Sequence, residues 1–167
     1  MRNPRDPRSR GTLIAVIGGS APTAEEAAAA EAVGLALARA GAVLVCGGRG
    51  GVMEAACRGA KSADGLTIGI LPGPDRSDAN PYVDIAIATG LGEARNAIIT
   101  RTAQAVIAIG GSYGTLSEIA FALRFGTPLV GLGTWEVKRE GHPQAPILYA
   151  ATAGEAAKRA LGLAKGR

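Results

Sequence analysis

The sequence has few of the residues on which several common classes of protein depend. It contains two cysteines, one histidine and one tryptophan, and aromatic residues make up 4% of it. Cys46 and Cys57 lack C-x-x-C spacing, so we expect neither a disulfide framework nor a metal site. The histidine, His142, lies between Gly141 and Pro143, where a solvated loop side chain is expected.

Long hydrophobic runs are also absent. A glycine, proline or charge interrupts every apolar run before the roughly 18 residues of a membrane span, so no membrane partner is expected. The basic first residues are followed by a short β-like run and not by the apolar core of a secretion signal, which predicts a cytoplasmic protein. With 47% hydrophobic and 19% charged residues, the 167-residue chain is too apolar to be disordered.

The net charge of +4 is concentrated at the two ends of the chain. Residues 1–10 carry four arginines and one aspartate, and residues 151–167 carry four cations and one glutamate, which leaves 11–150 slightly negative. A nucleic-acid groove needs clustered cations and stacking aromatic residues, so we expect no nucleic-acid partner. Binding through the two basic ends is kept as an alternative. Residues 1–10 are predicted to be a disordered basic arm, and 11–167 a single domain.

Short Val, Ile, Leu and Ala runs alternate with helical segments. Continuous apolar runs bounded by glycine, such as LIAVI, are typical of strands buried on both faces of a parallel sheet. Strands are predicted at 13–17, 42–46, 66–71, 83–88, 105–109 and 129–132. Helices are predicted at 24–40, 52–61, 93–102 and 115–125 and after a capping box at 152–155, whereas 133–150 gives no clear pattern. The alternation predicts a doubly wound α/β domain with a mainly parallel sheet.

Three glycine clusters each follow a predicted strand and precede a predicted helix. Such loops meet at the carboxyl edge of a parallel sheet, where glycine lets a ligand approach the backbone and helix N-termini attract anions. One cluster alone could equally make a tight turn, but three together indicate phosphate binding. The candidate phosphate-binding residues are Gly18, Gly19, Ser20, Gly47, Gly48, Arg49, Gly50, Gly51, Gly110, Gly111, Ser112, Gly114 and Thr115. The loop from Pro72 to Pro81 is expected to border the same pocket.

The standard nucleotide-binding fingerprints are missing. No G-x-x-x-x-G-K-[ST] sequence occurs, and no G-x-G-x-x-G follows the first predicted strand. These absences argue against a P-loop NTPase and an NAD dehydrogenase, and 167 residues leave no room for a dehydrogenase's substrate domain.

Two segments, GGRGGVMEAACRGA (47–60) and ARNAIITRTAQAVIAIGGSYGTLSEIAFAL (94–123), resemble the superfamily of the LONELY GUY phosphoribohydrolases and the molybdenum-cofactor carrier proteins. The resemblance covers most of 12–132. The superfamily motif PGG-x-GT-x-x-E is matched except that Ile109 replaces the proline. The resemblance implies a Rossmann-like fold, a phosphate held by the glycine-threonine loop, and a site near a homodimer interface. We therefore expect a homodimer or a higher homo-oligomer. The resemblance implies no required cofactor, with a nucleotide or molybdenum cofactor as the candidate bound ligand.

The resemblance also implies two catalytic positions. Arg95 and Glu118 match the arginine and glutamate that act on the N-glycosidic bond in the phosphoribohydrolases. A carboxylate can stabilise the positive charge that develops on ribose and activate water, and a guanidinium can bind phosphate or the carboxylate. The alternatives are that Glu118 only completes a helix-capping box with Thr115, and that Arg95 is solvated or paired with Glu93.

Two functions therefore remain open at this point. The first is binding of a phosphorylated, nucleotide-like ligand with hydrolysis of a nucleoside 5′-monophosphate to base and ribose 5-phosphate. The alternative is a carrier for molybdenum cofactor that does not turn its ligand over. The string Glu93-Ala94-Arg95-Asn96 departs from the His-Glu-Arg-Lys-like string of the hydrolases, and GLGEARN and IGGSYGTLSE are closer to the carrier branch.

Overall fold

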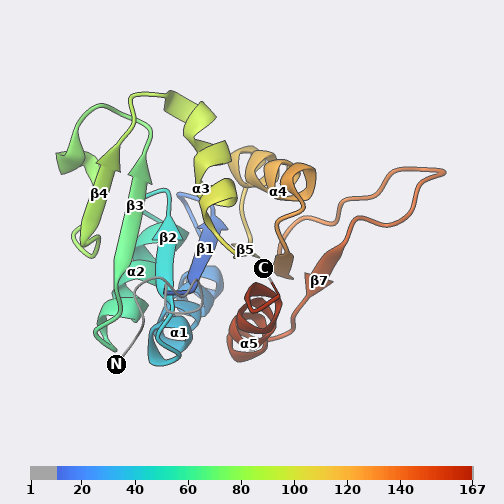
Figure 1. Ribbon diagram of the computed structural model, residues 1–167, viewed down its shortest axis with the longest axis horizontal. Helices are drawn as coiled ribbons and strands as arrows, with labels where there is room; N and C mark the ends of the chain where they lie inside the picture. Colours follow the sequence, from blue (N-terminus) through green and yellow to red (C-terminus); the bar gives the residue numbers. More distant parts are fainter. Residues whose placement is uncertain (1–10, 167) are drawn as a thin grey trace.

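The computed structural model describes residues 11–166 and contains one seven-stranded sheet with helices on both faces (Figure 1). The predicted arm at 1–10 lies outside the described residues. The strands are β1 (Leu13–Gly18), β2 (Val43–Cys46), β3 (Thr67–Leu71), β4 (Ile85–Ala88), β5 (Ala105–Ile109), β6 (Leu129–Leu132) and β7 (Ile147–Tyr149). The helices are α1 (Ala24–Arg39), α2 (Val52–Lys61), α3 (Asn96–Thr102), α4 (Tyr113–Phe125) and α5 (Ala153–Ala164), with 3-10 turns η2 (Arg76–Asp78) and η3 (Gly92–Arg95).

Every neighbouring pair of strands in the sheet is parallel, in the order β4-β3-β2-β1-β5-β6-β7. The predicted doubly wound, Rossmann-like α/β fold is therefore confirmed. The strand order runs outward from β1 in both directions, because the chain passes from β4 at one edge back to β5 beside β1. The boundary between β1 and β5 is thus the topological switch point, where ligands bind in sheets of this kind.

The helices form a layer on each face of the sheet. Apolar side chains of α1, α2 and α5 pack with one set of strand residues, including Ile107 of β5. The side chains of α3 and α4 pack with the alternate set, including Val106. Successive strand residues point to opposite faces, so the continuous apolar runs supply both cores at once.

The helices α1 and α2 touch backbone to backbone through two glycines. A Cβ at Gly34 in α1 would clash with the carbonyl oxygen of Ala56, and a Cβ at Gly59 in α2 would clash with that of Glu31. An ion pair of 2.8 Å between Arg58 Nη2 and Glu31 Oε2 spans the same contact. Since each helix directly follows a glycine loop, this packing fixes the two loops relative to each other.

The structure differs from the sequence prediction in three elements. The predicted helix at 93–102 begins as the 3-10 turn η3 and becomes α-helical at Asn96, and α4 begins at Tyr113, two residues earlier than predicted. The segment without a clear pattern contains β7, which pairs with β6 at the sheet edge and follows a long connection that extends from the molecule at the right of Figure 1. Within residues 11–166, no helix combines the length and apolarity needed to cross a membrane.

Candidate functional site

A cavity of about 300 Å³ lies beyond the carboxyl ends of β1, β2 and β5, at the switch point. Its walls come from the three loops that follow these strands, from η3 and from the first turns of α2, α3 and α4. The lining residues are Gly18, Gly19, Ser20, Arg49, Gly50, Met53, Glu93, Arg95, Asn96, Ser112, Gly114, Thr115 and Glu118.

This cavity brings both predicted catalytic positions together with part of each predicted glycine cluster. The remaining glycines of the predicted set are not among the lining residues: Gly47, Gly48, Gly51, Gly110 and Gly111. Three lining residues were absent from the predicted set. Glu93 and Asn96 lie close to Arg95 in the sequence, and this closeness could have identified them as site residues. Met53 is apolar, so nothing in its residue type indicated a binding site.

The glycines outside the lining hold the loops against one another. Gly51 has a φ of +74°, and a Cβ there would clash with the carbonyl oxygen of Gly19, which accepts a 3.0 Å hydrogen bond from the N–H of Val52. Gly111 has a φ of +98° and lies directly over the Thr115 side chain. Both conformations strongly favour glycine, so these positions set the shape of the cavity.

The helix N-termini around the cavity differ in how they are capped. In α1 the Thr23 side chain and Glu26 form a capping box, which occupies the amides that an anion would use. Within the described residues, no side chain caps α2, which begins after Gly51, or α4, which begins after Ser112. The first glycine cluster therefore contributes backbone to the cavity wall, and α4 contributes a free helix N-terminus that attracts anions. The first amide of α2, that of Val52, already donates to the carbonyl of Gly19.

Arg95 and Glu118 form a buried pair at the base of the cavity. Their side chains are 7% and 9% exposed, and Arg95 Nη1 lies 4.0 Å from Glu118 Oε1. The Nε of Arg95 is buried and has no hydrogen-bond partner among residues 11–166. Gly47 makes room for this guanidinium, because a Cβ at that position would clash with Nη1. A buried arginine with an unpaired donor is costly, so a ligand group that accepts from it would bind favourably.

Burial changes the ionisation of both members of this pair. Loss of solvation raises the pKa of Glu118 to about 8, although Arg95 acts in the opposite direction. Loss of solvation also lowers the pKa of Arg95, but a guanidinium remains charged at neutral pH. Glu118 is therefore predominantly a neutral acid at pH 7, and the base of the cavity carries a positive charge.

The structure excludes one of the two roles considered for Glu118, that of a helix-capping residue. Because α4 begins at Tyr113, Thr115 is the third residue of the helix and Glu118 lies in its second turn. A capping box would need Thr115 to precede the helix, so that arrangement is not formed. Arg95 is likewise buried beside Glu118 and is not a solvated surface residue.

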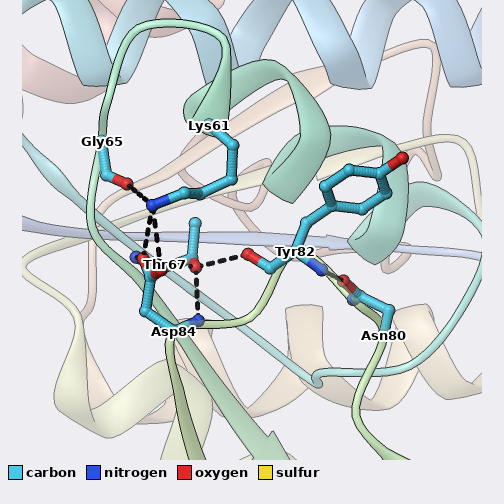
Figure 2. A network of polar contacts seen from close by, with 6 residues as sticks. All are labelled: Lys61, Gly65, Thr67, Asn80, Tyr82 and Asp84. Atoms are coloured by element: carbon cyan, nitrogen blue, oxygen red, sulfur yellow. Dashed lines mark hydrogen bonds and ion pairs between the residues drawn. The ribbon is translucent and has the colours of Figure 1, made fainter.

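The Gly47–Gly51 loop is supported from outside the cavity by the β3–β4 connection. Asn80 Nδ2 donates to the carbonyl of Arg49 at 2.9 Å, and the Asn80 N–H donates to that of Gly48 at 2.8 Å. Figure 2 shows how the connection is anchored: Lys61 donates to Asp84, and the buried Thr67 hydroxyl donates to the carbonyl of Tyr82. The predicted loop at 72–81 thus supports the wall of the cavity but does not line it.

The loop between β5 and α4 is held by the start of the β6–β7 connection. Thr134 Oγ1 donates to the carbonyl of Gly110 at 2.6 Å, and Trp135 Nε1 donates to that of Ser112 at 3.2 Å. The Trp135 ring also lies beside Tyr113, with 5.9 Å between centroids. The single tryptophan of the chain is therefore coupled directly to a lining residue of the cavity.

The two cysteines lie beneath the Gly47–Gly51 loop as free thiols. Their Sγ atoms are 3.5 Å apart, and Cys46 Sγ accepts a hydrogen bond from the N–H of Gly48. Within the described part of the chain, no group of three or more His, Cys, Asp and Glu side chains is placed to hold a metal ion.

Comparison with known proteins places this chain in a family. The model of the SLOG cluster4 family matches residues 11–157. The chain belongs to the SLOG cluster4 family. Since similar solved structures are molybdenum cofactor proteins, its resemblance to the superfamily that contains those carriers is confirmed.

Three relatives illustrate the similarity of this SLOG cluster4 chain. The molybdenum cofactor binding protein of Rippkaea orientalis is 36% identical, with a TM-score of 0.80 over 94% of this chain and 97% of that one. The molybdenum cofactor carrier protein of Chlamydomonas reinhardtii is 35% identical, with a TM-score of 0.80 over 92% and 98%. An uncharacterized protein of Archaeoglobus fulgidus is 47% identical over 119 residues, covering 71% of this chain and 78% of its own length.

Proposed function

We propose that the protein binds molybdenum cofactor, a phosphorylated pterin ligand, in the cavity at the switch point and carries it without turnover. The observation that supports this most strongly is Arg95, which lines the cavity beside a neutral Glu118 and has a buried Nε without a hydrogen-bond partner among residues 11–166. An anionic group in the cavity would satisfy that donor and offset the charge. The names of the similar proteins of Rippkaea orientalis and Chlamydomonas reinhardtii agree with such a ligand.

The residues at the start of α4 fit the phosphate of this ligand. The helix has 13 residues and no side-chain cap, so its first amides are free to donate to phosphate oxygens. Gly114 and Thr115 line the cavity in this first turn, where glycine permits close approach and the hydroxyl adds a donor. No metal ligands from the chain are required, because the ligand carries its own molybdenum.

The ionisation of Glu118 favours binding over hydrolysis. Cleavage of an N-glycosidic bond uses a carboxylate to stabilise positive charge on the ribose. With a pKa of about 8, Glu118 is predominantly protonated at neutral pH, so only a minor fraction of the protein carries that charge. As a neutral acid it can instead donate a hydrogen bond to an anionic oxygen, which strengthens binding.

Hydrolysis of a nucleoside 5′-monophosphate is the second candidate, favoured by the proximity of Arg95 and Glu118 within the cavity. If this reaction occurs, the ionised form of Glu118 carries it. The rate should then increase as pH is raised through about 8, where the carboxylate forms.

The test compares the two functions on one preparation of the full chain. The protein is loaded with molybdenum cofactor released from a molybdoenzyme, separated from free ligand by gel filtration, and mixed with a cofactor-free molybdoenzyme. In parallel it is incubated with nucleoside 5′-monophosphates at pH 7 and pH 9, and free base is quantified. We expect recovery of molybdoenzyme activity and no release of base.

Single-residue variants test whether cofactor loading and base release depend on the residues of the cavity. Arg95→Gln removes the buried cation and should abolish loading, whereas Arg124→Ala changes an exposed arginine at the far end of α4 and should load normally. Failure of the wild-type protein to retain cofactor would contradict the carrier function. Release of base that disappears in Glu118→Ala would establish the hydrolase instead.

A further inference from the structure

The Gly47–Gly51 loop has backbone donor groups that the phosphate proposed at the start of α4 would not contact. Asn80 binds the carbonyl oxygens of both Gly48 and Arg49 from outside the cavity. In a trans peptide the carbonyl of one residue and the N–H of the next point in opposite directions. The N–H groups of Arg49 and Gly50 therefore point away from Asn80, and Arg49 and Gly50 line the cavity whereas Asn80 does not.

The same part of the cavity also carries two cations. Arg49 is exposed at the mouth, and the buried Arg95 guanidinium packs against Gly47 at the start of this loop. The charge of Arg49 contributes to the lowered pKa of Arg95, so the two guanidinium groups lie within electrostatic reach of each other. Of the carboxyl groups that line the cavity, Glu118 is predominantly neutral and Glu93 lies at the exposed rim.

The Gly47–Gly51 loop and the start of α4 lie on opposite sides of the loop after β1. The position of a Cβ on Gly51 meets the carbonyl of Gly19, and that of a Cβ on Gly19 lies 3.5 Å from the Cα of Gly111. Gly19 therefore separates two uncapped helix N-termini, those of α2 and α4, which open into one cavity.

We propose that the cavity binds two anionic groups of one ligand, a phosphate at the start of α4 and a second tetrahedral oxyanion at Arg49, Gly50 and Arg95. The unpaired, buried Nε of Arg95 supplies the evidence for a ligand here that a helix N-terminus alone would not. The second group is either another phosphate or an oxyanion of a metal such as molybdenum, since both present oxygen acceptors to the same donors. This inference rests on the proposed function, because it assigns a second contact to the same ligand.

Backbone NMR of the full 15N-labelled chain tests the two subsites separately. Inorganic phosphate, sodium molybdate and AMP are titrated while the amides of Arg49 and Gly50 and those of Ser112 and Gly114 are followed. Phosphate is expected to shift both groups of amides. Saturating AMP should occupy the α4 subsite and leave the amides of Arg49 and Gly50 responsive to phosphate or molybdate added afterwards.

Variants assign the second subsite. Arg49→Ala should weaken anion binding at Arg49 and Gly50 about five-fold or more while affinity at α4 stays within about two-fold, since one charge-assisted contact is lost. Arg124→Ala makes the same charge change away from the cavity and should alter neither. Tighter binding of molybdate than phosphate at the second subsite would identify a metal oxyanion, and the reverse order would identify a second phosphate.

The outcomes separate this inference from the proposed function. Shifts confined to α4, loss of both responses with AMP, or a second response unchanged by Arg49→Ala would overturn the second subsite and leave the phosphate site intact. No response at α4 to phosphate or AMP, together with no retention of molybdenum cofactor, would overturn the proposed function as well.

Discussion

At the scale of single residues, the ionisation of Glu118 has a consequence for stability. Its pKa is raised to about 8 by burial, above the ordinary value of 4.5 that it regains on unfolding. Between these values the folded protein holds a proton that the unfolded chain releases. Stability therefore falls as pH rises from about 5 to 8.

Glu118→Gln should remove this pH dependence. We expect the free energy of unfolding of the wild type to fall by roughly 2–4 kcal/mol over this range because of Glu118, and that of the variant to stay correspondingly flatter. Urea denaturation at pH 5, 6.5 and 8 measures the difference. Glu140→Gln, an exposed position in the β6–β7 connection, serves as the control and should keep the wild-type slope. Equal slopes for wild type and Glu118→Gln would contradict the burial effect.

Gly47→Ala should weaken ligand binding much more than it destabilises the fold. The added Cβ would clash with Arg95 Nη1 and approach Met53 Sδ to 2.6 Å, both of which are ends of flexible side chains. We expect a loss of only about 1 kcal/mol in the free energy of unfolding, but a roughly 10-fold weaker affinity for AMP because Arg95 is displaced. Quenching of the Trp135 fluorescence gives the affinity, and Gly162→Ala in α5 is the control. An unchanged affinity would mean that the position of Arg95 does not matter.

Residue types were more predictable than residue environments. The spacing of Gly110, Gly111, Gly114, Thr115 and Glu118 was visible in the sequence, and so was an arginine at the matching position. The burial of Arg95 was not visible, because it depends on contact with Gly47, which lies 48 positions earlier and on another loop. Long-range contacts of this kind leave no periodic signal.

At the scale of elements, strong local patterns gave the correct bounds and weak ones did not. The helix α2 has the bounds that were predicted, because a glycine loop and a buried strand delimit it. The strand β7 was missed because it has three residues, two of them exposed, and therefore no long apolar run. The early start of α4 was missed because Thr115 resembles a cap, whereas the free amides of Tyr113 and Gly114 already belong to the helix.

Two glycine substitutions within helices should have opposite effects. Gly34→Ala places a Cβ against the backbone carbonyl of Ala56, which cannot move away easily, so we expect a loss of about 1–3 kcal/mol. Gly162→Ala meets nothing within 4 Å and should gain about 0.5–1 kcal/mol through helix propensity. Chemical denaturation of the two variants measures both changes. A stabilised Gly34→Ala would show that α1 and α2 are less tightly packed than described.

At the scale of the whole molecule, the predicted homodimer can be tested by measuring the molecular mass of the protein in solution. Ile98 is 37% exposed and, together with Phe125, lines a hollow on α3. We propose that a second copy of the chain covers this surface. Light scattering should give twice the 16.7 kDa of one chain, and Ile98→Glu should halve that mass because it places a charge in the interface. A wild-type mass equal to one chain would contradict the dimer.

The close contact of α1 and α2 determines how a ligand can leave. Because Gly34 and Gly59 join these helices at the backbone, the loops before them are held together as one wall of the cavity. Another wall is η3, a single four-residue turn preceded by Gly90 and beginning at Gly92, both at positive φ. The N–H groups of these two glycines donate to the carbonyls of Gly73 and Pro72. A hinge motion here that moved Arg95 away from a bound anion would have to break these two hydrogen bonds. Ligand release should therefore be slow where these hydrogen bonds hold, because the guanidinium that binds the anion can leave it only when the turn detaches from the 72–73 backbone.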